Sequence, residues 1–137
     1  MEKGKEMRKC KICGSTVNLQ KHHIISRKQQ PALIKCEMNL VDLCVYCHTS
    51  GPRAVHGNGF NELKKLRLEK QREYFEIFNE EKYSKEIIKD ILDINQNDVD
   101  KLLRPLKMSN GMYLREDVIR QCMGGKLLID TLSILEK

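Results

Sequence analysis

The chain has 137 residues, a formal net charge of +6 and six cysteines. This length allows one compact domain or two very small ones, and so small a core usually needs an additional cross-link. The chain begins with the charged stretch MEKGKEMRK and contains no apolar run of membrane-spanning length. We therefore expect neither a secretory signal nor a membrane partner, and we expect reduced thiols in a cytoplasm, where a metal ion can bind them.

The positive charge is concentrated in the first part of the chain. Residues 1–35 contain nine Lys and Arg side chains against Glu2 and Glu6, a net charge of +7, which leaves −1 for residues 36–137. Such a basic segment predicts a surface that faces a polyanion. For residues 1–9 a solvated basic tail is an equally good interpretation.

Four of the cysteines form two pairs with the same CxxC spacing: Cys10, Cys13, Cys44 and Cys47. This spacing lets two thiolates on one tight turn bind the same ion, and Gly14 supplies the unusual backbone angle after the second sulfur. Two such turns predict a tetrahedral structural zinc site. A redox CxxC or a set of unrelated buried cysteines leaves the second, matching pair unexplained. Cys36 and Cys122 lack partners at ligand spacing and are predicted to be small core residues.

A folded insert separates the two cysteine pairs. It begins with KHHIIS over residues 21–26, and it ends with Asn39 and the branched run LVDL over residues 40–43. The apolar runs at residues 24–25 and 40–43 predict two antiparallel strands. Residues from Cys44 onward predict a helix. The order of strand, loop, strand and helix, held by zinc, is the ββα-metal arrangement.

The segment from Cys10 to about His56 resembles the HNH endonucleases, in the version with four zinc-binding cysteines. The elements of that family occur here in order: CxxC, HHI, an Asn before a Leu-rich strand, and CxxCH. The resemblance implies an α+β protein with a ββα-metal (His-Me finger) nuclease module over residues 1–60. It also implies hydrolysis of DNA phosphodiester bonds with one divalent cation, for which Mg²⁺ is the abundant candidate and Mn²⁺, Ni²⁺ and Zn²⁺ are alternatives.

The resemblance further implies roles for four residues of the module. His22 and His48 would bind the catalytic cation, and His23 would be the general base that activates water. Asn39 would orient His23 by hydrogen bonding rather than touch the substrate. Adjacent residues of a strand point to opposite faces, which suits the different tasks of His22 and His23.

The role of His56 is left open by the sequence. Related nucleases sometimes carry a further ligating histidine one helical turn beyond the position of His48. Here the gap is eight residues and contains Gly51 and Pro52, which break a helix. His56 is therefore interpreted either as a third ligand or as a loop histidine.

A helical pattern follows over residues 61–82, with Asn61 as the expected N-cap. Its apolar stripe predicts a helix that packs over the nuclease module: Leu63, Leu66, Tyr74, Ile77 and Phe78. Its basic side chains are Lys64, Lys65, Arg67, Lys70 and Arg72. They either follow the DNA backbone or form a solvated face, because glutamates are interleaved with them.

Residues 83–137 predict a mostly helical domain. Two short amphipathic helices are joined by DINQN over residues 93–97, an extended piece follows at residues 112–114, and a third helix runs from about Glu116 to Gly124. This layout is similar to the small helix-turn-helix modules of phage excisionase and MerR-type proteins. In such modules the second helix enters the major groove, which nominates Asn97, Lys101 and Arg104.

Other interpretations of this domain remain open. Asp98 and Asp100 lie on the same helix and argue against phosphate contact, so a homodimer or a phage protein partner is an equal alternative to DNA. Residues 126–135 are apolar enough to form a docking or dimer helix. The resemblance implies a phage or prophage context, and with it the cytoplasm of a bacterial host cell.

Two hypotheses of function follow. The first is a metal-dependent DNA endonuclease with Arg27, Lys28 and Arg53 as further DNA contacts of its nuclease module. The second is a non-catalytic zinc-finger adaptor that binds DNA or protein through the same cysteines. His23 distinguishes them, because a binding module has no use for a general base beside a metal ligand.

Overall fold

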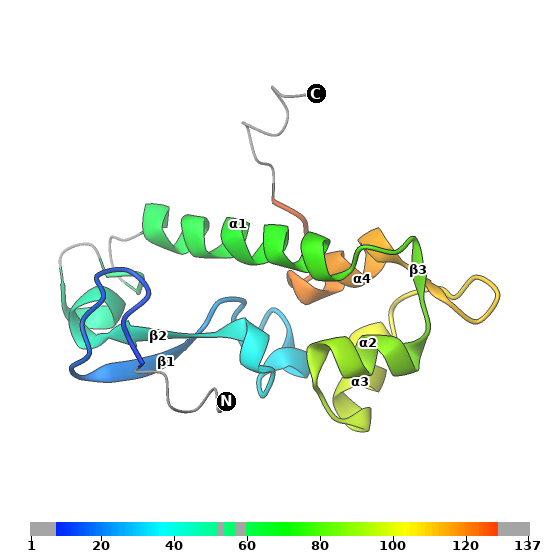
Figure 1. Cartoon of the computed structure of the whole chain (residues 1–137), viewed down its shortest axis with the longest axis horizontal. Helices are drawn as coiled ribbons and strands as arrows, with labels where there is room; N and C mark the ends of the chain where they lie inside the picture. Colours follow the sequence, from blue (N-terminus) through cyan, green and yellow to red (C-terminus); the bar gives the residue numbers. More distant parts are fainter. Residues whose placement is uncertain (1–7, 52–53, 57–59, 129–137) are drawn as a thin grey trace, which may run out of the picture.

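The computed structural model describes residues 8–51, 54–56 and 60–128, without the side chains of Phe60 and Asn61. It is an α+β fold with two small antiparallel sheets and a helical C-terminal region, as the sequence predicts. In chain order its strands and α-helices are β1 (Leu19–His23), β2 (Leu40–Cys44), α1 (Phe60–Ile77), β3 (Lys82–Tyr83), α2 (Lys85–Leu92), α3 (Gln96–Leu103), β4 (Tyr113–Leu114) and α4 (Arg115–Cys122). In Figure 1, α1 runs along the molecule, with the β1–β2 hairpin towards one end and α2 and α3 towards the other. None of the helices described is long and apolar enough to cross a bilayer.

The β1–β2 hairpin carries the histidine pair at the end of its first strand. His22 lies opposite Val41 and His23 opposite Leu40. The predicted strand over residues 24–25 is wrong, because β1 ends at His23 and the two isoleucines turn into the core. A two-stranded sheet leaves one face open to solvent, so it tolerates the polar sequence LQKHH, whereas the isoleucines gain more from full burial.

The helix predicted from Cys44 onward begins at Tyr46 and ends before Gly51, where the sequence predicts a break. Only a single wide turn of π-helix forms, over Tyr46–Ser50. The chain then turns at Gly51, whose N–H donates to the Tyr46 carbonyl at 2.8 Å. A Cβ at this glycine would lie 2.5 Å from that same carbonyl oxygen, so only glycine permits the turn.

One continuous core joins the insert between the two cysteine pairs to the C-terminal helices. Its largest fully buried side chains come from the insert, from α1 and the residue after it, and from α2, α3 and α4: Ile25, Leu33, Tyr74, Phe78, Ile88, Leu92, Leu102, Leu103 and Ile119. Cys36 and Cys122 are buried in this core, as predicted. A smaller cluster surrounds the four paired cysteines and includes Leu43 and Leu66. The apolar stripe of α1 thus contributes to both clusters, and the expected cap Asn61 lies outside the described side chains.

The C-terminal region folds as two short helices followed by a hairpin and a third helix. Asp93 adopts a left-handed conformation (φ 53°) at the end of α2, and Asn95 caps α3 by accepting from the Asp98 N–H at 2.8 Å. β3 pairs with β4, which explains why α1 ends at Ile77 rather than near residue 82. Helix α3 packs against the 3-10 turn Pro31–Leu33 of the insert between the cysteine pairs.

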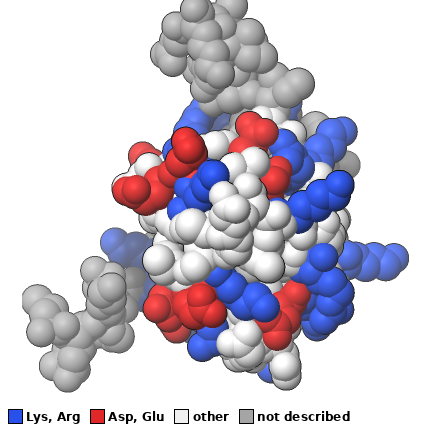
Figure 2. Space-filling view, turned by 90° about the vertical axis from the view of Figure 1, so that its right-hand side faces the viewer, with Lys and Arg blue, Asp and Glu red and all other residues white. Residues whose placement is uncertain are grey.

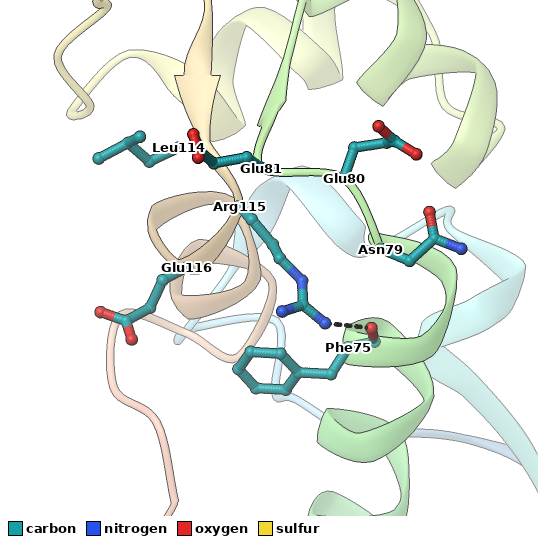
Figure 3. Close-up of a pocket in the computed structure, with 7 residues that line it drawn as sticks. All are labelled: Phe75, Asn79, Glu80, Glu81, Leu114, Arg115 and Glu116. Carbon is teal, nitrogen blue, oxygen red and sulfur yellow. Dashed lines mark hydrogen bonds between the residues drawn. The ribbon is translucent and has the colours of Figure 1, made fainter.

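Arg115 ties the start of α4 to the end of α1. Its guanidinium donates to the carbonyl of Phe78 and, at 2.6 Å, to that of Phe75, and it lies 4.9 Å from the centre of the Phe75 ring. Figure 3 shows this side chain reaching α1 from a hollow rimmed by Glu80, Glu81 and Glu116. The last carbonyls of a helix have no partner within it, so a cation at this position satisfies them and interacts favourably with the helix dipole.

Replacing Arg115 with Met should lower the free energy of unfolding by about 1–3 kcal/mol, because two helix-terminal carbonyls lose a charged donor. Urea denaturation followed by circular dichroism measures this change. Lys126→Met is the matched control, since Lys126 is exposed after α4 and its loss should cost less than about 0.5 kcal/mol. Equal stability of the two variants would contradict the role given to Arg115.

Candidate active site

The four paired cysteines converge where the chain enters and leaves the β1–β2 hairpin. Their sulfur atoms all lie within 4.8 Å of one another, and those of Cys13 and Cys44 are 3.6 Å apart. Each pair forms a tight turn in which a backbone N–H approaches the first sulfur, from Cys13 to Cys10 at 3.5 Å and from Cys47 to Cys44 at 3.4 Å. Gly14 has the left-handed conformation (φ 80°) that the sequence predicts. Four thiolates in this arrangement are the ligand set of a structural zinc site.

The pKa shifts of these thiols are those expected when four sulfurs are packed together to bind a cation. Burial raises the pKa of Cys10, but backbone N–H groups, led by that of Cys13, outweigh it and lower the pKa to about 6. Burial and the neighbouring sulfurs, first that of Cys44, raise the pKa of Cys47. Thiolates packed this closely repel one another, and a dication removes that repulsion.

Three of the four histidines form a second cluster beside the hairpin. Ligating nitrogens of His22, His48 and His56 all lie within 4.8 Å of one another, and the ring centres are 4.5 to 5.2 Å apart. His22 is 5% exposed, and its Nε2 has no hydrogen-bond partner among the described residues. Burial, followed by the charges of His56 and His48, lowers the pKa of His22 to about 4, so this imidazole is neutral at pH 7. A buried, neutral and unpartnered imidazole nitrogen is the form that binds a metal ion.

The backbone explains how His56 reaches this cluster. After the turn at Gly51 the chain doubles back, and the His56 N–H donates to the His48 carbonyl at 3.1 Å. The preceding Val55 N–H donates to the Cys47 carbonyl at 2.9 Å. The eight-residue gap that left His56 open in the sequence is therefore a loop that returns, and His56 lies beside His48 instead of away from it.

Gln20 orients His48 and was missed by the sequence reasoning. Its Oε1 lies 2.6 Å from the His48 Nδ1, which donates to it and leaves Nε2 with a free lone pair. A signal for this contact was present, because Gln20 lies two positions before His22 on the same strand. Residues i and i+2 share a face, so a polar side chain there is directed to the same cluster.

His23 points away from the three-histidine cluster yet borders the same pocket. Its Nε2 lies 3.0 Å from the carbonyl oxygen of Ile34. A carbonyl can only accept, so Nε2 carries the proton and Nδ1 carries the lone pair. The pocket is lined by all four histidines together with Lys21, Ser26 and Arg27.

Asn39 holds the turn that follows the histidine pair. This residue is fully buried, and its side chain accepts from the Ile25 N–H at 2.9 Å while donating to the carbonyls of Ile25 at 3.0 Å and Leu33 at 3.3 Å. Its own carbonyl accepts from the Ile24 N–H at 2.8 Å. These bonds place the backbone after His23 next to the backbone that leads to Ile34. Asn39 lies away from solvent, so it acts on the position of His23 through the chain.

Comparison with protein families agrees with this geometry. The family model described as HNH endonuclease matches residues 10–51. Residues 10–51 are an HNH domain. The matched segment contains both cysteine pairs, the histidine pair, Asn39 and His48, and it ends before His56 and the C-terminal helices. Neither the curated proteins nor the solved structures contain a match to the chain.

Arg67 connects α1 to the HNH domain and is the second residue that the sequence reasoning misplaced. It was expected on a solvated or DNA-facing side, but its side chain is half-buried, and burial lowers its pKa. Its Nε donates to the Ile24 carbonyl at 3.1 Å and its Nη2 to Gln29 Oε1 at 3.0 Å. With the bonds from Asn39, every backbone N–H and C=O of Ile24 and Ile25 has a partner.

The expected DNA contacts that the structure describes lie in two separate places. Arg27 and Lys28 are exposed, and Arg27 lines the histidine pocket. Lys101 and Arg104 are exposed on α3, in the C-terminal region, and do not line that pocket. Arg53 lies outside the described residues.

Replacement of Cys47 with Ser should abolish stoichiometric zinc binding and unfold the HNH domain, because metal binding and folding are one equilibrium in a core of this size. Zinc content by elemental analysis and amide dispersion in NMR spectra would measure both effects. Cys122→Ala is the control, since this buried thiol lies in the other cluster and its replacement should leave the zinc content of the wild type unchanged. A zinc-free Cys47→Ser protein with a native spectrum would contradict the structural role of the site.

Gln20→Leu should weaken binding of Co²⁺ to the histidine cluster by about 10–100-fold, because His48 loses the acceptor that orients its ring. Absorption of Co²⁺ added to the zinc-loaded protein reports this affinity. Gln20→Glu is the matched variant, since a carboxylate accepts the same N–H and should retain wild-type affinity or better. Wild-type affinity in Gln20→Leu would show that His48 does not need this support.

Proposed function

We propose that the protein is a metal-dependent endonuclease that hydrolyses phosphodiester bonds of DNA. The observation that carries the proposal is the separation of the two neighbouring histidines of β1. His22 belongs to the cluster that can hold a cation. His23 borders the same pocket, and its Nδ1 has a free lone pair because its Nε2 carries the proton. An acceptor for a proton and a site for a cation, side by side, are what phosphodiester hydrolysis requires.

His23 is the proposed general base. Its Nε2–H is held by the Ile34 carbonyl, so the ring cannot rotate freely and Nδ1 presents its lone pair. A water molecule between Nδ1 and a phosphorus atom would give up its proton to Nδ1 as its oxygen attacks. A neutral imidazole nitrogen with a free lone pair can accept this proton.

His22, His48 and His56 would hold the divalent cation. When bound, such a cation stabilises the negative charge that develops on the leaving oxygen. The sequence favoured Mg²⁺ as the most abundant ion, but Mg²⁺ prefers oxygen ligands, and three neutral imidazoles are better matched to Mn²⁺, Ni²⁺ or Zn²⁺. Gln20 would keep Nε2 of His48 directed at the ion, and the burial of His22 would keep its ring neutral.

DNA as the substrate is supported by charge around the pocket. Arg27 and Lys21 line it, and Lys28 is exposed next to Arg27. Only Lys21 among these three lies near a carboxylate, 3.7 Å from Glu37, within the described residues. Cations that are not neutralised by the protein itself are available to phosphates.

His23→Ala should reduce nicking of supercoiled plasmid by at least about 100-fold, because the reaction loses its proton acceptor. Agarose gels with wild-type and variant protein, each tested with Mg²⁺, Mn²⁺, Ni²⁺ and Zn²⁺, measure this loss. The variant should keep its zinc content and circular dichroism spectrum, since His23 lies outside both clusters. No histidine outside the pocket can serve as a matched control, because all four border it. Rescue by free imidazole takes its place: added imidazole should restore part of the activity of His23→Ala and should not raise that of the wild type.

Undiminished nicking by His23→Ala would refute the base. A wild-type protein that nicks DNA with none of the four ions would favour the non-catalytic zinc-binding adaptor instead.

A further inference from the structure

The C-terminal region has a second basic surface, separate from the histidine pocket. Helix α3 buries Val99, Leu102 and Leu103 and leaves the opposite side in solvent. The exposed side chains Asn97, Lys101 and Arg104 follow one another at spacings of four and three residues, so they lie on one line along the helix. We call these three residues the α3 stripe. We propose that the α3 stripe binds duplex DNA in its major groove, independently of the cleavage reaction.

The charges around the stripe support an anionic partner. Asp100, which argued against DNA in the sequence, forms an ion pair with Lys85 at 2.8 Å and accepts from Gln96 at 3.0 Å. Asp98 lies half-buried in the first turn of α3, where a negative charge interacts with the helix dipole. Among the described residues, Lys101 and the nearby Lys107 form no ion pair, and the charge of Arg104 lies close enough to Asp100 to lower its pKa. The face therefore carries at least two cations that the protein leaves available.

A β-hairpin next to α3 shapes this surface. The N–H of Ser109 donates to the Met112 carbonyl at 2.8 Å and that of Met112 to the Ser109 carbonyl at 3.1 Å. Asn110 and Gly111 have φ angles of 56° and 78°, as in a two-residue turn between strands. The hairpin and α3 enclose a shallow hollow whose walls include Arg104 and Met108. A helix with one exposed polar side and a hairpin next to it is the kind of surface that a major groove and the adjacent backbone accept.

The face lacks the features of a protein-docking site. Within the described structure, α3 exposes no large apolar side chain. Between Lys107 and Met112 of the hairpin, Met108 is the only exposed one. The cores of protein interfaces are depleted in charge and rich in apolar and aromatic groups. Figure 2 views this end of the molecule, where Lys and Arg side chains extend along one edge and Asp and Glu side chains lie among them elsewhere on the face. Charge therefore favours a nucleic acid over an apolar protein partner.

The structure also fixes the stripe relative to the pocket. Helix α3 packs against the turn Pro31–Leu33, and Gln30 Nε2 donates to the carbonyl of Gln121 in α4 at 2.7 Å. The residue after this turn is Ile34, whose carbonyl holds His23. DNA held by the α3 stripe would thus lie at a set distance from the histidine pocket.

The experiment measures DNA binding by the full-length, zinc-loaded His23→Ala protein, which removes the proposed cleavage. Fluorescence anisotropy with a labelled duplex would be recorded between about 50 and 200 mM salt. Adding Lys101→Gln and Arg104→Gln should weaken binding about tenfold at low salt. It should also reduce the slope of log affinity against log salt by about 2, because each phosphate contact contributes about 0.9. The matched control adds Lys82→Gln and Lys126→Gln, which remove the same charge from the same region outside the stripe and should change affinity less than about twofold.

Unlabelled duplex RNA provides the second measurement. Its major groove is too deep and narrow for side chains to read, so it should compete much less well than duplex DNA of the same length. The proposal is overturned if the stripe variant keeps wild-type affinity and slope, which would leave this face for a protein partner. It is equally overturned if both double variants lose affinity alike, or if RNA competes as well as DNA.

Discussion

One buried side-chain amide, that of Asn39, is the interaction on which the arrangement of the histidines depends. The amide bonds to the backbone N–H and C=O of Ile25 and to the carbonyl of Leu33. The backbone carbonyl of Asn39 accepts from the Ile24 N–H. The chain after His23 is therefore fixed against the chain that carries Ile34, and the Ile34 carbonyl can reach the His23 ring. Each donor or acceptor left unpaired by removal of this amide would cost about 1–3 kcal/mol in a buried position, so the turn would not keep its geometry without it.

Two further restraints complete the support of the hairpin. The four sulfurs lie at the end where Leu19 faces Cys44, and Asn39 acts at the opposite end, beyond His23. Arg67 of α1, which lies outside the HNH domain, donates to the carbonyl of Ile24, the one backbone group of Ile24 and Ile25 that Asn39 does not bond. Both ends of the hairpin are thus held in place. Because side chains alternate along a strand, His22 joins the three-histidine cluster and His23 lies on the other face. The different environments follow from this alternation: His22 is buried with a lowered pKa, and His23 has one nitrogen held by a carbonyl.

The features that the sequence predicted are those encoded by short spacings. The two CxxC pairs, the histidine pair and the turn at DINQN each lie within a few residues, so local geometry determines them. Asn39 was identified through the resemblance to the HNH family instead, because its side chain meets Ile25 across 14 residues. Gln20 and Arg67 were missed because they meet His48 and Ile24 across 28 and 43 residues, although strand alternation from His22 gave a usable signal for Gln20. The strand was placed too late because residues 24–25 have the composition of a strand but are taken by the core. His56 could not be placed because the reversal at Gly51 depends on contacts with Tyr46 that no local pattern records.

The central claim is that His22, His48 and His56 share one cation while His23 stays free to accept a proton. Anomalous diffraction from crystals of the zinc-loaded protein soaked in Mn²⁺ tests it most directly. The account predicts one peak at the sulfur cluster from zinc and a second, from manganese, within about 2.0–2.3 Å of a nitrogen from each of the three histidines. A manganese peak bound by His23, or one that lies away from the three-histidine cluster, would contradict it.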